Sequence, residues 1–106
     1  MAFVGIYAAF RSERNIKIQS CVFVLVVLCG ICFKISSLEW AVILLSSAFV
    51  FCTELLNTAL ENICDFIEPQ NNQKIKNIKD IAAGAVLIAS LLSLVIGLII
   101  LIPYFF

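Results

Sequence analysis

Three acids and an amide share one helical face in a very apolar stretch of the chain. Residues 52–65 read CTELLNTALENICD and follow the apolar run AVILLSSAFVF. The stripe is spaced i, i+3, i+4, i+7 and i+11, and its members are Glu54, Asn57, Thr58, Glu61 and Asp65. An ionised carboxylate deep in a bilayer costs about 3 kcal/mol, so this stripe is expected to face other helices or a water-filled cleft.

The two glutamates of this stripe predict a cation site as well as a contact between helices. Asn57 and Thr58 alone would be enough to join helices by hydrogen bonds. Glu54 and Glu61 carry like charge, and no basic residue shares their face, so they are expected to need a cation. Carboxylates suit Mg²⁺, which binds through one or two of them together with substrate phosphates. Asp65 ends the stripe at the membrane surface.

Glu54 is the deepest acid of the stripe. It precedes Glu61 by seven residues, so it lies about 10 Å deeper along a helix that rises ~1.5 Å per residue. That separation makes it a poor ligand for the same ion within one chain. A carboxylate at this depth suits a general base that acts on a hydroxyl near the membrane interface, with Asp80 as the next candidate.

A second charged pair, Lys79 and Asp80, comes directly before the third apolar block, at the same level as Glu61 and Asp65. Two interpretations of Lys79 stay open on the residues alone. It could be an ordinary lysine at the cytoplasmic end of a span, or it could contact a phosphate. The small residues at positions 82–85 favour a close approach of two helices.

Three long apolar blocks have to position these residues. The chain has 106 residues, of which 63% are hydrophobic and 13% charged, far from the soluble average of about half apolar and a quarter charged. Spans are predicted over residues 17–35, 39–62 and 80–103, because a membrane span needs roughly 20 apolar residues. The first block lacks the small-residue cleavage site of a signal peptide. The expected fold class is an all-α integral membrane protein with a single domain, residues 1–106.

Residues 1–15 are predicted to form an amphipathic helix on the membrane surface. Apolar residues recur there at helical spacing: Phe3, Ile6, Tyr7 and Phe10. The alternative, a frayed start of the first span, would leave Arg11, Glu13 and Arg14 in or near lipid.

The basic residues predict the orientation. Six of the seven fall on one side of a three-span arrangement. The positive-inside rule then places the N-terminus and a loop over residues 66–79 in the cytoplasm, and the C-terminus outside. A single three-span chain is expected to leave its polar stripe unshielded, so a homo-oligomer is predicted. Nothing in the sequence predicts a nucleic-acid partner.

The chain resembles the small prokaryotic diacylglycerol kinase family, which includes the undecaprenol kinases. Three motifs carry the resemblance: AAFRSERNIKIQ in residues 8–19, ELLNTALENICD in 54–65, and KIKNIKDIAAGAVLIAS in 74–90. The middle motif, E-x-x-N-[TS]-A-x-E-x-x-x-D, is specific, and the resemblance covers nearly the whole chain. The sequence contains no glycine-rich phosphate loop of the kind found in soluble kinases.

The resemblance implies a homotrimeric bundle in the bacterial inner membrane that moves the γ-phosphate of ATP to a lipid hydroxyl, with Mg²⁺. Glu54 matches the family's catalytic base, and Glu13 and Glu61 match its metal-binding acids. The residues that match nucleotide-binding positions are Glu13, Glu61, Asn71, Asn72, Lys79 and Asp80. The residues that match positions shaping the site or contacting substrate are Asn57, Asp65, Arg14, Asn15 and Ala83.

Some positions depart from the family pattern. Gln19 stands where the Gram-positive-type pattern has a histidine, and Asn71 and Asn72 stand where a tyrosine and a histidine are common. The lipid alcohol could be undecaprenol or diacylglycerol, and the segments ERN and FKISSLEW favour undecaprenol. The alternatives from another class are a non-catalytic membrane subunit and a small ion-coupled transporter that uses its intramembrane acids.

Overall fold

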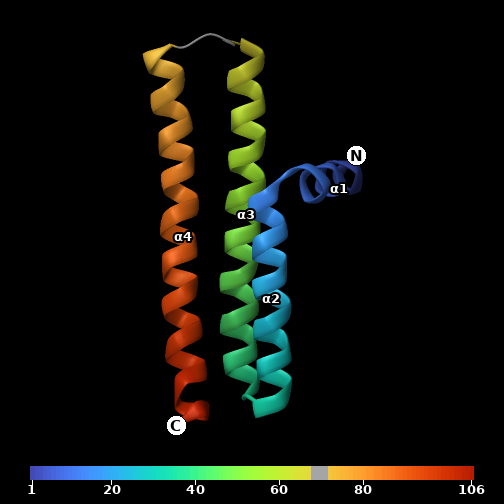
Figure 1. Cartoon of the computed structure of the whole chain (residues 1–106), viewed down its shortest axis with the longest axis vertical. Helices are drawn as coiled ribbons and strands as arrows, with labels where there is room; N and C mark the ends of the chain where they lie inside the picture. Colours follow the sequence, from blue (N-terminus) through green and yellow to red (C-terminus); the bar gives the residue numbers. More distant parts are fainter. Residues whose placement is uncertain (68–71) are drawn as a thin grey trace.

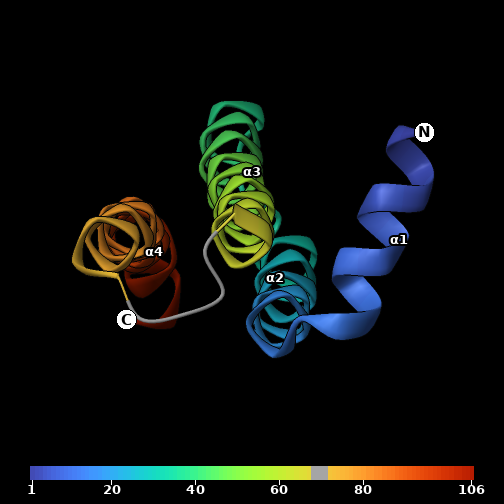
Figure 2. The ribbon, with the colours of Figure 1, turned by 90° about the horizontal axis from the view of Figure 1, so that it is seen from above.

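Long helices account for nearly all of the described chain. The computed structural model describes residues 1–67 and 72–106, and these form α1 (Ala2–Ser12), α2 (Arg14–Phe33), α3 (Ser37–Ile67) and α4 (Gln73–Phe105). α2, α3 and α4 run roughly alongside one another, whereas α1 points away from them (Figures 1 and 2). The expected all-α fold is confirmed.

A single residue, Glu13, separates α1 from α2. Its backbone is extended, with φ −94° and ψ 119°, and this interrupts the helix. The interruption turns α1 sideways, at a level part-way along α3 (Figure 1). One of the predicted metal-binding acids therefore lies at the corner where α1 leaves the bundle.

A tight turn joins α2 to α3. Lys34 adopts the left-handed conformation (φ 52°, ψ 54°) at the end of α2. Ser36 and Glu39 then form a capping box: the Glu39 N–H donates to Ser36 Oγ (3.1 Å) and the Ser36 N–H donates to Glu39 Oε1 (3.0 Å). Gly30 allows the Trp40 ring to pack onto α2, because a Cβ at this position would lie 2.7 Å from Trp40 Cη2. The start of α3 is thus fixed against the end of α2.

α3 and α4 form an antiparallel pair that extends beyond the start of α2 (Figure 1). Asn72 caps α4, since its side-chain oxygen accepts a hydrogen bond from the Lys74 N–H at 2.9 Å. At the other end of the pair, the Tyr104 hydroxyl donates to Glu39 Oε1 at 2.5 Å. The Phe33 ring packs against Tyr104 and Phe105, so aromatic contacts close that end of the bundle.

Three of the helices, α2, α3 and α4, are long and apolar enough to cross a membrane, and the protein is a membrane protein. Their ends differ from the expected ranges. α3 continues to Ile67 and α4 begins at Gln73, so much of the segment 66–79, which was expected to be a loop, is helical. The 31 residues of α3 span about 46 Å, which is more than the ~30 Å thickness of a hydrocarbon core. Either α3 tilts in the membrane or one of its ends projects from the hydrocarbon core.

The polar stripe of α3 is enclosed within one chain. Glu54 is 1% exposed, and Asn57 and Thr58 are each 8% exposed. The expectation that a single chain would leave this stripe unshielded is therefore wrong for its deepest part. The reason is that the first turns of α2 cover it: Ile16 is fully buried, and the side chains of Asn15 and Gln19 reach Glu54.

Candidate functional site

The candidate site lies where the first turns of α2 pack against the middle of α3. The side chains of Asn15 and Gln19 hydrogen-bond the Glu54 carboxyl group. These two residues are four positions apart, so they project from the same face of α2. On α3, the Thr58 hydroxyl donates to the Glu54 backbone carbonyl at 3.0 Å, which uses the hydroxyl within the helix. The Glu54 side chain is thus held by groups from another helix.

Three buried oxygen atoms of the site have no donor among the described residues. They are Gln19 Oε1, Glu54 Oε2 and Asn57 Oδ1. An unpaired buried polar group costs about 1–3 kcal/mol, so such groups normally have a reason to persist. Because all three atoms accept hydrogen bonds, the site suits a ligand that donates one, such as a hydroxyl group, or a cation.

Two further carboxylates lie close to this centre. Glu13 and Glu61 are near enough to Glu54 to interact with it electrostatically. Asn57 Nδ2 donates to Glu61 Oε1 at 3.3 Å and so orients the Glu61 carboxylate. Both glutamates are half-buried. The sequence prediction that Glu54 and Glu61 share one face with Asn57 is confirmed, and Glu13 joins them from the corner between α1 and α2.

The donor set fits Mg²⁺. Hard cations take oxygen ligands, and this site offers carboxylates together with the unpaired Asn57 Oδ1. Among the described residues, however, no three His, Cys, Asp or Glu side chains come together in a way that could hold a metal ion by themselves. Mg²⁺ commonly uses only one or two protein carboxylates and completes its shell with water and substrate phosphates. The described residues would therefore supply only part of the shell of a Mg²⁺ ion and not a closed cage.

An ion pair lies on the α3–α4 side of the site. Lys79 Nζ donates to Asp65 Oδ1, and this is the one ion pair in the part of the chain that the structure describes. Asp65 follows Glu61 by one helical turn. The positive charge of Lys79 therefore lies next to the acid stripe. The sequence predicted this position, because it placed Lys79 at the same level as Glu61 and Asp65.

The other predicted residues lie at the rim of the site or away from it. Arg14, Asp80 and Ala83 are exposed in the single chain. Asn72 is exposed and serves as the cap of α4. Asn71 lies outside the described residues. The structure therefore places Glu13 and Glu61 near enough to Glu54 to interact with it electrostatically, whereas Asn72 and Asp80 are exposed.

Gln19 was not among the candidate residues taken from the sequence. In the sequence, Gln19 differs from the Gram-positive-type pattern, which has a histidine at this position. The structure places its amide on Glu54, with its oxygen buried and unpaired. Its spacing from Asn15 could have identified Gln19 as a site residue. A second amide one turn further into an apolar helix is expected to face a polar partner.

Three helices able to cross a membrane, with a carboxylate buried between two of them, define an integral membrane protein with a polar site inside its bundle. Two further acids interact electrostatically with that carboxylate, and a lysine lies at the rim. The chain belongs to the prokaryotic diacylglycerol kinase family, whose profile matches residues 1–101. The family expected from the three motifs is confirmed.

Two relatives are similar over nearly the whole chain. An undecaprenol kinase of Bacillus subtilis (strain 168) is 38% identical over 99 residues, which cover 93% of this chain and 80% of the relative. A diacylglycerol kinase of Synechocystis sp. (strain ATCC 27184 / PCC 6803 / Kazusa) is 36% identical over 103 residues, which cover 96% of this chain and 59% of the relative. The chain thus spans less than two thirds of the second relative. Both names are those of kinases, and neither supports a transporter or a non-catalytic subunit.

Proposed function

We propose that the protein is an ATP-dependent lipid kinase that transfers the γ-phosphoryl group of ATP to the hydroxyl of a membrane lipid alcohol. The observation that carries this proposal is Glu54, a carboxylate that is 1% exposed and keeps one unpaired oxygen inside an apolar bundle. The family and the names of both relatives support the reaction class.

Glu54 acts as the general base. Asn15 and Gln19 hold its carboxyl group and leave Oε2 free, so the lipid hydroxyl can donate its hydrogen bond there. The hydroxyl oxygen attacks the γ-phosphorus of ATP and Glu54 accepts the hydroxyl proton. The bond between the γ-phosphorus and the oxygen that bridges it to the β-phosphate breaks, and ADP leaves with that oxygen. Base assistance of this kind is typically worth about 10²–10⁴-fold in rate.

The acids and the lysine serve the nucleotide. Glu13 and Glu61 are the residues that would hold Mg²⁺, and Asn57 keeps Glu61 oriented through its 3.3 Å hydrogen bond. When bound, Mg²⁺ supplies positive charge that offsets the charge of the phosphates. Lys79, Asp80, Asn71 and Asn72 contact the nucleotide in this proposal. Arg14, Asp65 and Ala83 shape the surrounding surface.

The proposed location is the bacterial inner membrane. The N-terminus and residues 66–79 face the cytoplasm, where ATP is available, and the C-terminus lies outside, as the basic residues suggest. α1 lies on the membrane surface: Phe3 is 86% exposed and Tyr7 64% exposed, which suits an interfacial helix. The functional unit is a homotrimer.

The lipid alcohol is undecaprenol or diacylglycerol, and we favour undecaprenol. The segments ERN and FKISSLEW support this choice, and so does the 38% identity to the Bacillus subtilis undecaprenol kinase. Hydrocarbon contacts alone discriminate weakly between long-chain alcohols, because a methylene group contributes only about 1–3 kcal/mol.

The test is a side-by-side assay of the purified protein in detergent with ATP and Mg²⁺. One sample receives undecaprenol, a second receives diacylglycerol, and a third receives no lipid. Phosphorylated lipid should form in the first sample faster than in the second, and ATP consumption should need the lipid. Absence of phosphorylated product from both alcohols would overturn the proposed function.

A further inference from the structure

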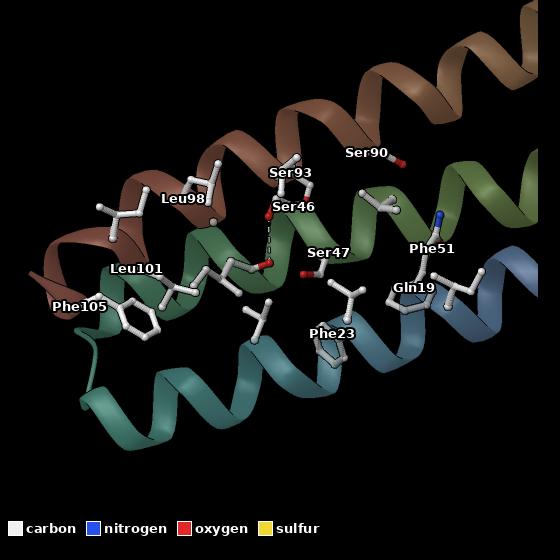
Figure 3. A pocket seen from close by; sticks show the side chains of 18 residues that line it. Gln19, Phe23, Ser46, Ser47, Phe51, Ser90, Ser93, Leu98, Leu101 and Phe105 are labelled. Carbon is white, nitrogen blue, oxygen red and sulfur yellow. Dashed lines mark hydrogen bonds between the residues drawn. The ribbon is translucent and has the colours of Figure 1, made fainter.

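Three phenylalanine rings from three different helices pack together near the corner where α1 leaves the bundle. Phe10, in the last turn of α1, stacks on Phe51 of α3, with ring centroids 5.9 Å apart and an interplanar angle of 17°. Phe23 of α2 meets Phe51 edge-on, at 5.9 Å and 90°. Figure 3 shows Phe23 and Phe51 near Gln19, between α2 and α3. Both pairs have the separations that favourable aromatic contacts adopt.

These rings lie one helical turn from acids of the candidate site. Phe51 precedes Glu54 by three residues on α3, so the two side chains share a face of that helix. Phe10 precedes Glu13 by three residues, and Glu13 follows directly after the end of α1. The contact between Phe10 and Phe51 therefore joins the segment that carries Glu13 to the helix that carries Glu54.

The backbone of Glu13 links α1 to α2. Its N–H donates to the Ala9 carbonyl at 2.9 Å, and its carbonyl accepts from the Lys17 N–H at 3.3 Å. Its side chain makes no capping hydrogen bond at the start of α2. The direction in which the Glu13 carboxylate points consequently follows the angle between α1 and α2.

The angle of α1 depends on contacts near its C-terminal end. Ala9 is 7% exposed and Phe10 is 36% exposed, whereas Phe3, near the other end, is 86% exposed. Hydrophobic burial holds helices together weakly in a membrane, because lipid surrounds an apolar side chain as well as protein does. The shape and stacking of the two rings are therefore what keeps Phe10 on Phe51.

We propose that Phe10 and Phe51 are positioning residues whose stacked rings fix the angle of α1 and thereby place the Glu13 carboxylate for Mg²⁺. This inference rests on the proposed kinase function, which makes Glu13 and Glu61 the residues that would hold the ion. A phenyl ring offers no oxygen ligand, so both rings act only through Glu13. Without the stacking, α1 turns about the extended backbone of Glu13 and the affinity for the ion falls.

The proposed general base does not depend on α1. Its carboxyl group is hydrogen-bonded by Asn15 and Gln19 of α2, so Glu54 keeps its place when α1 turns. A positioning role for Phe10 thus predicts weaker metal binding with an unchanged KM for the lipid alcohol. A general loss of folding would lower both.

The experiment measures Mn²⁺ binding to the purified protein in detergent with ADP, from the electron paramagnetic resonance signal of free Mn²⁺. Mn²⁺ prefers the same oxygen ligands as Mg²⁺, and this readout needs no turnover. Phe10 is the residue to change, because Phe51 also lines the groove between α2, α3 and α4 whereas Phe10 does not. Phe10→Leu keeps an apolar side chain without the ring, and the Kd for Mn²⁺ should rise about two- to tenfold, the factor that an aromatic pair contributes.

Two further variants show whether the ring itself is needed. Phe10→Tyr keeps the ring and should bind Mn²⁺ as the wild-type protein does. Phe3→Leu is the matched control: it makes the same change on the same helix, and Phe3 has no ring contact among the described residues. Its Kd should be unchanged. The Mg²⁺ concentration for half-maximal rate should rise in Phe10→Leu by the same factor as the Kd for Mn²⁺.

A double-mutant cycle tests whether Phe10 and Phe51 act as a pair. Once Phe51→Leu has removed the contact, changing Phe10 as well has nothing further to remove. The chain that carries both Phe10→Leu and Phe51→Leu should therefore bind Mn²⁺ as tightly as Phe51→Leu alone. Effects that multiply would show that the two residues act independently, and this would overturn the proposal.

The remaining outcomes separate this inference from the proposed function. If the wild-type protein phosphorylates no lipid alcohol, the kinase function fails, and the Mn²⁺ measurements still decide the positioning role. If it phosphorylates one but Phe10→Leu binds Mn²⁺ as Phe3→Leu does, the positioning role is overturned and the function stands. Equal losses in Phe10→Leu and Phe10→Tyr, or no Mn²⁺ binding by the wild-type protein, would also overturn the positioning role.

Discussion

We predict that Glu54 acts on a hydroxyl group and does not serve only to join helices. A purely structural glutamate in an apolar bundle would have both carboxyl oxygens paired, whereas Glu54 is held by two amides and keeps Oε2 free. Glu54→Gln preserves the shape and removes the base. Turnover should fall about 10²–10⁴-fold, with ATP binding and assembly retained.

The check is a steady-state assay beside a nucleotide-binding measurement on the same sample. If Glu54→Gln kept more than about a tenth of the wild-type rate, Glu54 would be a structural residue. Asp80 would then be the next acid to replace.

Gln19 is predicted to position Glu54. Gln19→Leu removes the amide that hydrogen-bonds the carboxyl group. Hydrogen bonds to charged groups contribute about 1.5–3 kcal/mol, so kcat should fall roughly 10–100-fold with little change in the KM for ATP. Gln19→His keeps an N–H donor and should recover most of the rate. Equal losses in both variants would indicate a packing role instead.

Glu61 is predicted to act through the metal ion. Glu61→Gln should raise the Mg²⁺ concentration needed for half-maximal rate and lower turnover by orders of magnitude, because a carboxylate ligand is lost. Glu39→Gln is the control, since Glu39 lies at the other end of α3, where it caps the helix and accepts from Tyr104. An unchanged Mg²⁺ titration in Glu61→Gln would count against the assignment.

At the scale of elements, the periodicity of the sequence predicts the helices better than their ends. The apolar blocks identify α2, α3 and α4, but α3 and α4 each continue past the apolar residues into charged sequence. Charged residues such as Lys74 and Lys76 are compatible with a helix outside the membrane, so hydropathy marks where lipid ends and not where the helix ends. The capping residue Asn72 is what fixes the start of α4.

The packing of α2 on α3 depends on Gly30. A Cβ there would approach Trp40 Cη2 to 2.7 Å and Ile35 Cδ1 to 3.1 Å, so Gly30→Ala should separate the helices and destabilise the fold by about 1–3 kcal/mol. Gly84→Ala is the matched control, because its Cβ would meet no atom within 4 Å. Thermal unfolding in detergent should show a lower midpoint for Gly30→Ala alone. Equal midpoints would mean that the Trp40 contact does not constrain α2.

At the scale of the whole molecule, the sequence predicted that polar residues of α3 share one face, but it did not predict how one chain covers them. The polar stripe on α3 could be predicted from helical spacing, because spacing is a local property of the sequence. Its burial depends on the break at Glu13, which lets α2 begin part-way along α3 and place Asn15 and Gln19 over Glu54. No local pattern encodes that register, because it results from contacts between residues about 40 positions apart.

The arrangement of charge predicts that a single chain is an incomplete enzyme. Glu13 and Glu61 interact electrostatically with Glu54, while the one ion pair among the described residues joins Lys79 to Asp65. A triphosphate brought to these acids needs positive groups beside Mg²⁺, since phosphoryl transfer is promoted mainly by charge stabilisation. Glu61 is only half-buried and Asp80 is exposed, so part of the site faces outward in one chain.

We therefore expect a homotrimer in which neighbouring copies complete the nucleotide site. Cross-linking in native membranes at native protein density should give a product of three chains. Mixing Glu54→Gln chains with Lys79→Ala chains, each inactive alone, should restore part of the activity if a base from one copy and a lysine from another meet in one site. Full activity from a species that stays monomeric would contradict the trimer. Trimers that regain no activity on mixing would place Glu54 and Lys79 of a single chain in the same site.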